Sequence, residues 1–272
     1  MILYPNAKIN LGLNVVERRI DGYHNIETVI YPIGLTDILN LQISDTCDEY
    51  SFTSSGIHID GDTDQNLIIK AYKLLQLDYQ IPPLDISLCK QIPCGAGLGG
   101  GSSDAAFMLK GINELFQLNI SVSKLESYAS KLGADCPFFI ENEPVYATGI
   151  GTHFEKFKPL LKGYYLLLVK PDVHVSTAAA YSKVIPKTSG VSLIESLELP
   201  ISEWKYHVKN DFELSVFSQH PMVGSIKEQL YSMGALFASM SGSGSSVYGI
   251  FQDSIAVHQE FDSCFVVGGV LD

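Results

Sequence analysis

The chain has 272 residues, of which 46% are hydrophobic and 18% are charged. These values are typical of a globular protein with one large domain or two smaller ones. The formal net charge of −12 argues against a nucleic acid or an anionic membrane as partner, because no broad basic surface exists to attract either. An anionic ligand would therefore have to be held locally, by backbone N–H groups, helix ends and a few placed cations.

The five cysteines are odd in number and form no C-x-x-C pair, so they indicate neither a disulfide framework nor a zinc site. The N-terminal residues lack the basic flank and long apolar run of a signal peptide, and no stretch approaches the length of a membrane span. We therefore expect a reduced, cytoplasmic setting. The sequence leaves open whether the protein is a monomer or a homodimer.

The first predicted element is a strand from Ala7 to Val16, where apolar and polar residues nearly alternate. Lys8 and Asn10 fall on the same face of this strand. A lysine in a strand is most often a solvated surface residue, and this is the alternative to a functional role for Lys8.

A turn and then a helix are predicted next. The Asp21-Gly22 pair indicates a tight turn, which places Tyr23 and His24 at its end. A run of short strands follows, and Asp64 is then expected to cap a helix over residues 65–77.

The stretch Pro93–Asp104, P-C-G-A-G-L-G-G-G-S-S-D, follows a predicted strand over residues 84–92 and leads into a helix. Its glycines allow positive φ angles and leave room for a ligand against the backbone. We expect Ser102, Ser103 and Asp104 to cap the helix. A glycine loop at a helix start directs N–H groups and the positive end of the helix dipole to one point, which suits a phosphate.

Three known nucleotide-binding patterns can be compared with this first glycine loop, Pro93–Ser103. A Walker loop needs a Gly-Lys pair, which occurs nowhere in the chain. Gly95-x-Gly97-x-x-Gly100 matches the dinucleotide fingerprint, but Pro93 separates it from the preceding strand, and another helix is predicted where a Rossmann unit has its second strand. The protein-kinase motifs H-R-D and D-F-G are absent.

Two further features lie beyond the loop. Asp135, in G-A-D-C-P, is expected in a tight turn after a helix that opens with the capping box Ser123-x-x-Glu126. Taken alone, such an aspartate usually serves only the turn. A second glycine cluster, Met240–Ser246, lies between a predicted helix and a predicted strand, which favours a folded turn over a flexible linker.

The string P-x-G-A-G-L-G-G-G-S-S-D-A-A resembles the second motif of the GHMP small-molecule kinases, which include galactokinase, homoserine kinase and mevalonate kinase. The second glycine cluster resembles their third motif, which lies beside the first loop and closes the phosphate site. K-I-N…R-x-D-G-Y-H, from Lys8 to His24, resembles the signature of one branch, the 4-diphosphocytidyl-2-C-methyl-D-erythritol kinases. G-A-D-C-P-F-F and Asn210-Asp211-Phe212-Glu213 are similar to two more segments of that branch, so the resemblance runs from Ala7 to Phe251.

This resemblance implies an α+β, two-domain GHMP kinase fold. Residues 1–158 would form a domain like ribosomal protein S5 domain 2, and residues 159–272 a ferredoxin-like domain. The implied reaction transfers the γ-phosphate of ATP to the C2 hydroxyl of 4-diphosphocytidyl-2-C-methyl-D-erythritol, in non-mevalonate isoprenoid biosynthesis. Mg²⁺ would accompany the nucleotide, although no motif assigns its ligands and Ser103 is only a candidate.

The resemblance also implies a role for each candidate site residue. Asp135 would be the catalytic base, and Lys8 would orient it and counter the charge on the transferring group. The expected substrate-binding residues are Tyr23 stacked on the cytosine, His24 at its edge, Tyr181 on the opposite side, and Asn10 at the sugar alcohol. The expected ATP-binding residues are Pro93, Cys94, Gly95, Ala96, Gly97, Leu98, Gly99, Gly100, Gly101, Ser102 and Ser103, with Asn66 on the adenine side.

Three rival functions remain at this point. A GHMP kinase for another alcohol, such as homoserine, is disfavoured by the G-Y-H triplet and the triple glycine. A catalytically silent relative acting as a sensor is disfavoured by the presence of both Lys8 and Asp135. An NAD-dependent oxidoreductase is disfavoured by the context of the loop.

Overall fold

The computed structural model describes residues 1–47, 49–187, 190–256 and 261–271. The chain forms two compact units that alternate along the sequence. Unit 1 comprises Met1–Lys8, Leu35–Cys94 and Gly99–Glu143, and unit 2 comprises Ile9–Gly34, Gly95–Leu98 and Pro144–Asp272. Both units contain helices and strands, which confirms the α+β class. The domain boundary between residues 158 and 159 stays a prediction.

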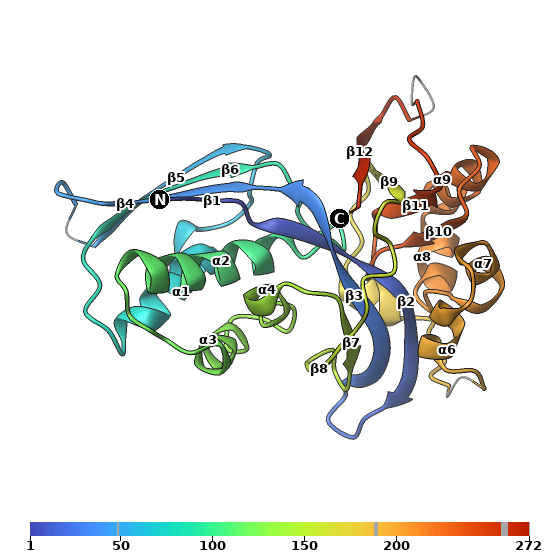
Figure 1. Cartoon of the computed structure of the whole chain (residues 1–272), viewed down its shortest axis with the longest axis horizontal. Helices are drawn as coiled ribbons and strands as arrows, with labels where there is room; N and C mark the ends of the chain where they lie inside the picture. Colours follow the sequence, from blue (N-terminus) through green and yellow to red (C-terminus); the bar gives the residue numbers. More distant parts are fainter. Residues whose placement is uncertain (48, 188–189, 257–260, 272) are drawn as a thin grey trace. The chain divides into compact units, whose positions relative to one another are not determined.

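Unit 1 is built on a four-stranded sheet with the strand order β1-β4-β6-β5. Its strands are β1 (Ile2–Leu3), β4 (Ile38–Ile43), β5 (Tyr50–Gly56) and β6 (Leu84–Lys90). The helices α1 (Leu67–Gln76) and α2 (Gly100–Leu115) lie side by side along this sheet (Figure 1). The short 3-10 helix η1 (Thr63–Gln65) precedes α1, and α3 (Val122–Ala129) and α4 (Phe138–Glu141) pack beside α2.

Two of the predicted helix caps in unit 1 are wrong. Asp64 lies within η1, and the N-cap of α1 is Asn66, whose side chain accepts a hydrogen bond from the Ile68 N–H at 2.9 Å. Likewise, α3 begins after Ser121, whose hydroxyl accepts from the Lys124 N–H, rather than at Ser123. In both cases several cap-type residues occur within a few positions, so the pattern predicts a helix start but not which residue caps it.

Unit 2 contains a four-stranded antiparallel sheet with the order β10-β11-β9-β12. Its strands are β9 (Tyr165–Pro171), β10 (Phe237–Met240), β11 (Val247–Phe251) and β12 (Cys264–Val270). Of these four strands, β9 comes first in the sequence, and it pairs with the third, β11, and the fourth, β12. This is the strand order of a ferredoxin-like sheet. The helix α9 (Pro221–Ser232) contributes Ile226 and Leu230 to a core shared with Leu167 and Val247.

Further helices of unit 2 are α5 (Thr177–Tyr181), α6 (Leu193–Glu198), η2 (Ile201–Glu203), α7 (Trp204–His207) and α8 (Glu213–Gln219).

A third sheet has the order β2-β3-β7-β8, with β2 (Asn6–Arg18), β3 (His24–Thr36), β7 (Val145–Thr148) and β8 (His153–Lys156). Gly22, with φ +89°, lies in the turn between β2 and β3, so the predicted position of Tyr23 and His24 is confirmed. Within the described ranges, no helix combines the length and the apolar character needed to cross a membrane.

Candidate active site

Lys8 and Asp135 form an ion pair within unit 1. The side chain of Lys8 is 5% exposed, and its Nζ lies 3.5 Å from Oδ2 of Asp135, which is 40% exposed. Asp135 occupies the turn between α3 and α4, as predicted. Lys8 is therefore not a solvated strand lysine: it is a buried cation beside a carboxylate that a ligand can reach.

The N-terminus of α2 lies beside this pair. The N-cap is Gly99, with φ +71°, and no side chain caps the helix. Ser102, Ser103 and Asp104 therefore lie in the first turns of α2 and do not cap it, contrary to the prediction. A Cβ atom on Gly99 would come within 3.2 Å of Cγ of Lys8. A glycine start thus brings the open N–H groups of α2 close to Lys8, which suits a phosphate.

A cavity of about 560 Å³ also opens in unit 1. Its walls come from β5, from the loop after it and from the starts of α1 and α2, and they include Asn66, Cys94 and Gly101. This volume lies within the range of roughly 300–1,000 Å³ that is common for small-molecule sites. Of the predicted nucleotide residues, Asn66, Cys94 and Gly101 therefore share one cavity.

In unit 2, residues 95–98 of the first glycine loop lie against the second glycine cluster. The Ser241 hydroxyl donates to the Gly97 carbonyl at 2.8 Å, and the Ser246 N–H donates to the Ala96 carbonyl at 3.2 Å. Gly97 has φ +77°, and a Cβ atom there would lie 2.0 Å from the Ser241 carbonyl oxygen. The close approach thus requires glycine at position 97.

The four predicted substrate-binding residues all lie in unit 2. The ring of His24 stacks on Tyr181, with ring centroids 4.6 Å apart and an interplanar angle of 21°, while Tyr23 is 63% exposed at the hairpin. Asn10 is 4% exposed, and its Nδ2 donates to the Thr28 hydroxyl at 3.0 Å. The structure therefore brings His24 and Tyr181 into direct contact.

Comparisons with known proteins agree with these features. The model of the GHMP kinases N terminal domain matches residues 66–142, and that of the GHMP kinases C terminal matches residues 197–264. A 4-diphosphocytidyl-2-C-methyl-D-erythritol kinase from Parabacteroides distasonis is 56% identical, over 100% of both chains. One from Bacteroides fragilis is 54% identical, over 97% of each chain. This chain belongs to the GHMP kinase family, in its 4-diphosphocytidyl-2-C-methyl-D-erythritol kinase branch.

Solved structures support the same membership. A crystal structure of 4-(cytidine 5'-diphospho)-2C-methyl-D-erythritol kinase matches with a TM-score of 0.77 and 31% identity, over 92% of this chain and 90% of that one. A mevalonate kinase matches with a TM-score of 0.64 and 13% identity, over 98% of each chain, and so shows the GHMP kinase fold alone.

Unit 1 of this GHMP kinase also contains a buried ionic cluster that was not predicted from the sequence. Nζ of Lys90 lies 2.7 Å from Oδ2 of Asp104 and also donates to Oδ2 of Asp37, and all three side chains are at most 4% exposed. The N–H groups of Gln91 and Ile92 donate to Oδ1 of Asp37. Lys90 and Asp104 also line the 560 Å³ cavity.

Burial and the neighbouring charges shift the pKa values of Lys90 and Asp104. Burial alone would lower the pKa of Lys90, but the carboxylates of Asp104 and Asp37 outweigh it and raise that pKa. Burial and the like charge of Asp37 raise the pKa of Asp104 to about 7.

One signal of this cluster was present in the sequence: Lys90 is in phase with Leu84, Ile86 and Leu88 on the buried face of β6. A charge at a predicted core position implies a buried partner.

Proposed function

We propose that this protein uses ATP to phosphorylate the C2 hydroxyl of 4-diphosphocytidyl-2-C-methyl-D-erythritol. The observation that carries the proposal is the Lys8–Asp135 pair beside the glycine start of α2. The names of the relatives supply the substrate. The step belongs to the non-mevalonate synthesis of isoprenoid precursors, and we place it in the cytoplasm.

In the proposed mechanism, Asp135 accepts the proton of the acceptor hydroxyl. Phosphoryl transfer requires mainly positioning and the stabilisation of charge. The buried ammonium of Lys8, 3.5 Å away, holds the carboxylate of Asp135 in place and offsets negative charge on the transferring group. The open N–H groups at the start of α2 bind phosphate oxygens through fixed dipoles.

The nucleoside part of ATP is assigned to the 560 Å³ cavity of unit 1. Asn66 lines this cavity while its side-chain oxygen caps α1, so a contact with the nucleotide would be made by a side chain that is already held in place. The first glycine loop, from Pro93 to Ser103, is assigned to the triphosphate.

The cytidyl group is assigned to the aromatic residues near the β2–β3 hairpin. Tyr23 presents an exposed ring that can stack on a base, and base stacking on an aromatic side chain contributes about 1–3 kcal/mol. His24, which stacks on Tyr181, offers ring nitrogens to the edge of the cytosine, and Tyr181 is assigned to the side of the cytosine opposite Tyr23. Asn10 is assigned to the sugar alcohol.

Mg²⁺ is proposed to arrive with ATP. The described part of the chain contains no group of three His, Cys, Asp or Glu side chains that could hold a metal ion. Ser103, whose buried hydroxyl has no hydrogen-bond partner among the described residues, stays a candidate ligand. The described residues thus show no such ligand group of their own, and none of the steps above depends on the metal.

The decisive experiment measures ATP consumption with and without the cytidyl substrate. We expect turnover to depend on that substrate and to fall by several orders of magnitude in Asp135→Asn, while ATP binding is retained. Asp45→Asn is the matched control, because Asp45 is an exposed carboxylate of the same unit. Near-normal turnover in Asp135→Asn would exclude Asp135 as the base, and turnover with homoserine alone would exclude the substrate.

A further inference from the structure

The segment Asn210-Asp211-Phe212-Glu213 follows α7 in unit 2 and ends at the first residue of α8. We infer that this segment is a positioning element: Asn210 and Glu213 hold the second glycine cluster, and Phe212 holds the His24–Tyr181 pair. The inference rests on the proposed function. That function assigns the first glycine loop, to which the second cluster is bonded, to the triphosphate, and the aromatic residues near the β2–β3 hairpin to the cytidyl group. The inference gives a role to a motif that the proposed mechanism does not otherwise use.

Asn210 holds the second glycine cluster through its amide. The side chain is 3% exposed, and its Nδ2 donates to the carbonyl oxygens of Met240 at 2.9 Å and Gly242 at 2.8 Å. Its Oδ1 accepts from the N–H of Phe212 at 3.0 Å, so the amide is itself oriented. Because Ser241 lies between the two bonded carbonyls and contacts Gly97, Asn210 sets where the two glycine segments meet.

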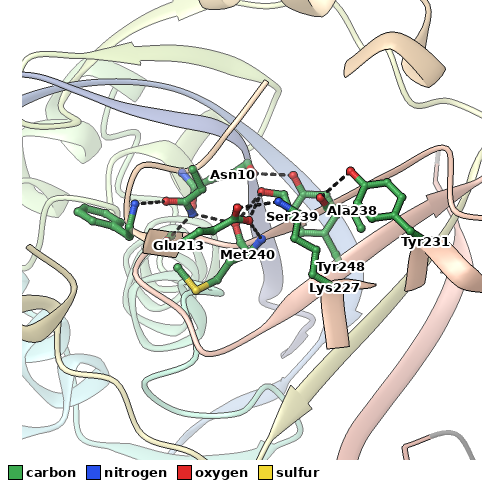
Figure 2. A network of polar contacts seen from close by, with 11 residues as sticks. Asn10, Glu213, Lys227, Tyr231, Ala238, Ser239, Met240 and Tyr248 are labelled. Atoms are coloured by element: carbon green, nitrogen blue, oxygen red, sulfur yellow. Dashed lines mark hydrogen bonds and ion pairs between the residues drawn. The ribbon is translucent and has the colours of Figure 1, made fainter. Parts of the chain in front are cut away.

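Glu213 holds the same cluster from the side of β10. Its Oε1 accepts from the Met240 N–H at 3.0 Å and from the Ser239 hydroxyl at 3.1 Å, and its Oε2 accepts from Nζ of Lys227 at 2.6 Å (Figure 2). Met240 is therefore bonded at its N–H by Glu213 and at its carbonyl by Asn210. Two side chains of one motif thus determine where β10 ends and the cluster begins.

β2 is tied to the same region. The Tyr248 hydroxyl donates to the Asn10 carbonyl at 2.8 Å (Figure 2), and burial raises the pKa of Tyr248, so it stays a donor. Asp211 accepts from the N–H of Val15 through its Oδ2 at 2.8 Å, which anchors the motif to β2.

Phe212 reaches the aromatic pair. Its ring lies edge-on to Tyr181, with centroids 4.6 Å apart and an interplanar angle of 73°, and Tyr181 stacks on His24. Phe212 is 3% exposed, so its ring is held by the core of unit 2. The ring of Phe212 therefore limits where Tyr181, and through it His24, can lie.

The test compares isosteric or near-isosteric variants of the full-length protein. Asn210→Asp turns the donor to two carbonyls into an acceptor, and Phe212→Leu keeps an apolar residue but removes the ring edge. Gln252→Glu is the matched control, because Gln252 is an exposed amide of the same unit and gains the same charge as Asn210→Asp. Affinities for an ATP analogue and for cytidine diphosphate are measured separately, with melting temperatures for each variant.

We expect Asn210→Asp to weaken the ATP analogue about tenfold, the effect of losing one or two buried hydrogen bonds, and to leave cytidine diphosphate within twofold. Phe212→Leu should weaken cytidine diphosphate about threefold to tenfold and spare the ATP analogue. Gln252→Glu should change neither. A merely structural role would shift both ligands together, or shift the melting temperature alone, and either result overturns the inference.

If Asn210→Asp does not fold, Glu213→Met tests the same arm, because a side chain of similar length then offers no acceptor to the Met240 N–H and the Ser239 hydroxyl. Selective loss of ATP-analogue affinity supports the inference, and an unselective effect overturns it. Failure of the proposed function has a different outcome: wild-type protein would then bind no cytidine diphosphate. In that case the contrast between Asn210→Asp and Gln252→Glu with the ATP analogue still decides the role of Asn210.

Discussion

Tyr23 is a single exposed side chain on which the proposed substrate preference depends. Its ring is 63% exposed, so Tyr23→Ala removes little packing. We expect the variant to bind the cytidyl substrate about tenfold or more weakly, as the loss of base stacking predicts, and to bind ATP normally. Paired calorimetric titrations measure both affinities.

Tyr4→Ala is the matched control, because Tyr4 is 58% exposed and has no proposed contact with a ligand. It should bind both ligands like the wild type. Equal losses for the two ligands in Tyr23→Ala would place Tyr23 outside the cytidyl site.

At the scale of single residues, the sequence predicted which side chains share a face of a strand better than it predicted which side chains are in contact. The alternation of β2 placed Lys8 and Asn10 on one face, and both are buried. The partners of Lys90 were not predictable in this way, because Asp37 and Asp104 lie 53 and 14 residues away in the sequence. Such a pairing depends on the order of strands in the sheet, which a local pattern does not contain.

At the scale of elements, the contact between the two glycine segments can be tested by enlarging Gly97. Gly97→Ala places a methyl group 2.0 Å from the Ser241 carbonyl oxygen, so the segments must move apart. We expect the KM for ATP to rise about tenfold or more, as the loss of several positioned phosphate contacts predicts. Steady-state kinetics at saturating second substrate measure this change.

Gly163→Ala is the control for backbone strain. Gly163 has φ +86°, close to that of Gly97, but a Cβ atom there meets nothing within 4 Å. Both variants thus carry the strain of a left-handed alanine, and only one carries the clash. If Gly163→Ala raised the KM as much as Gly97→Ala, strain alone would explain the effect.

The helices and strands that were predicted have the right type but errors at their ends, and α6 was not predicted. The start of α2 shows why: Ser102, Ser103 and Asp104 are good capping residues, yet the chain turns at Gly99 because glycine adopts φ +71° without strain. A cap prediction compares side chains, whereas the start here is set by the backbone and by the space beside Lys8. The site residues that came from motifs did not depend on such boundaries.

At the scale of the molecule, the family resemblance predicted the α+β class and the ferredoxin-like strand order, and these are confirmed. The division into two alternating units was not foreseen. The contiguous boundary between residues 158 and 159 stays a prediction, but β2 contributes residues 6–8 to unit 1 and residues 9–18 to unit 2. Long-range strand pairing decides compactness, and sequence composition reports it only indirectly.

The stability of the whole protein should depend on pH through Asp104. Its pKa is raised from 3.8 to about 7, by burial first and then by Asp37. Lys90 only partly offsets these effects, because it is shared between two carboxylates and Oδ1 of Asp104 has no partner among the described residues. Between those two pKa values the folded protein holds a proton that the unfolded chain has released. The free energy of unfolding therefore falls as pH rises through this window and levels off above about pH 7.

Asp104→Asn removes this dependence while keeping the shape of the side chain. The unfolding free energy of the wild type minus that of the variant should fall from pH 5 to pH 7, by up to roughly 1 kcal/mol per pH unit. Urea titrations at several pH values measure the difference, in which the contributions of other groups cancel. A flat or rising difference for Asp104→Asn would mean that Asp104 is already ionised throughout this range, fully neutralised by Lys90.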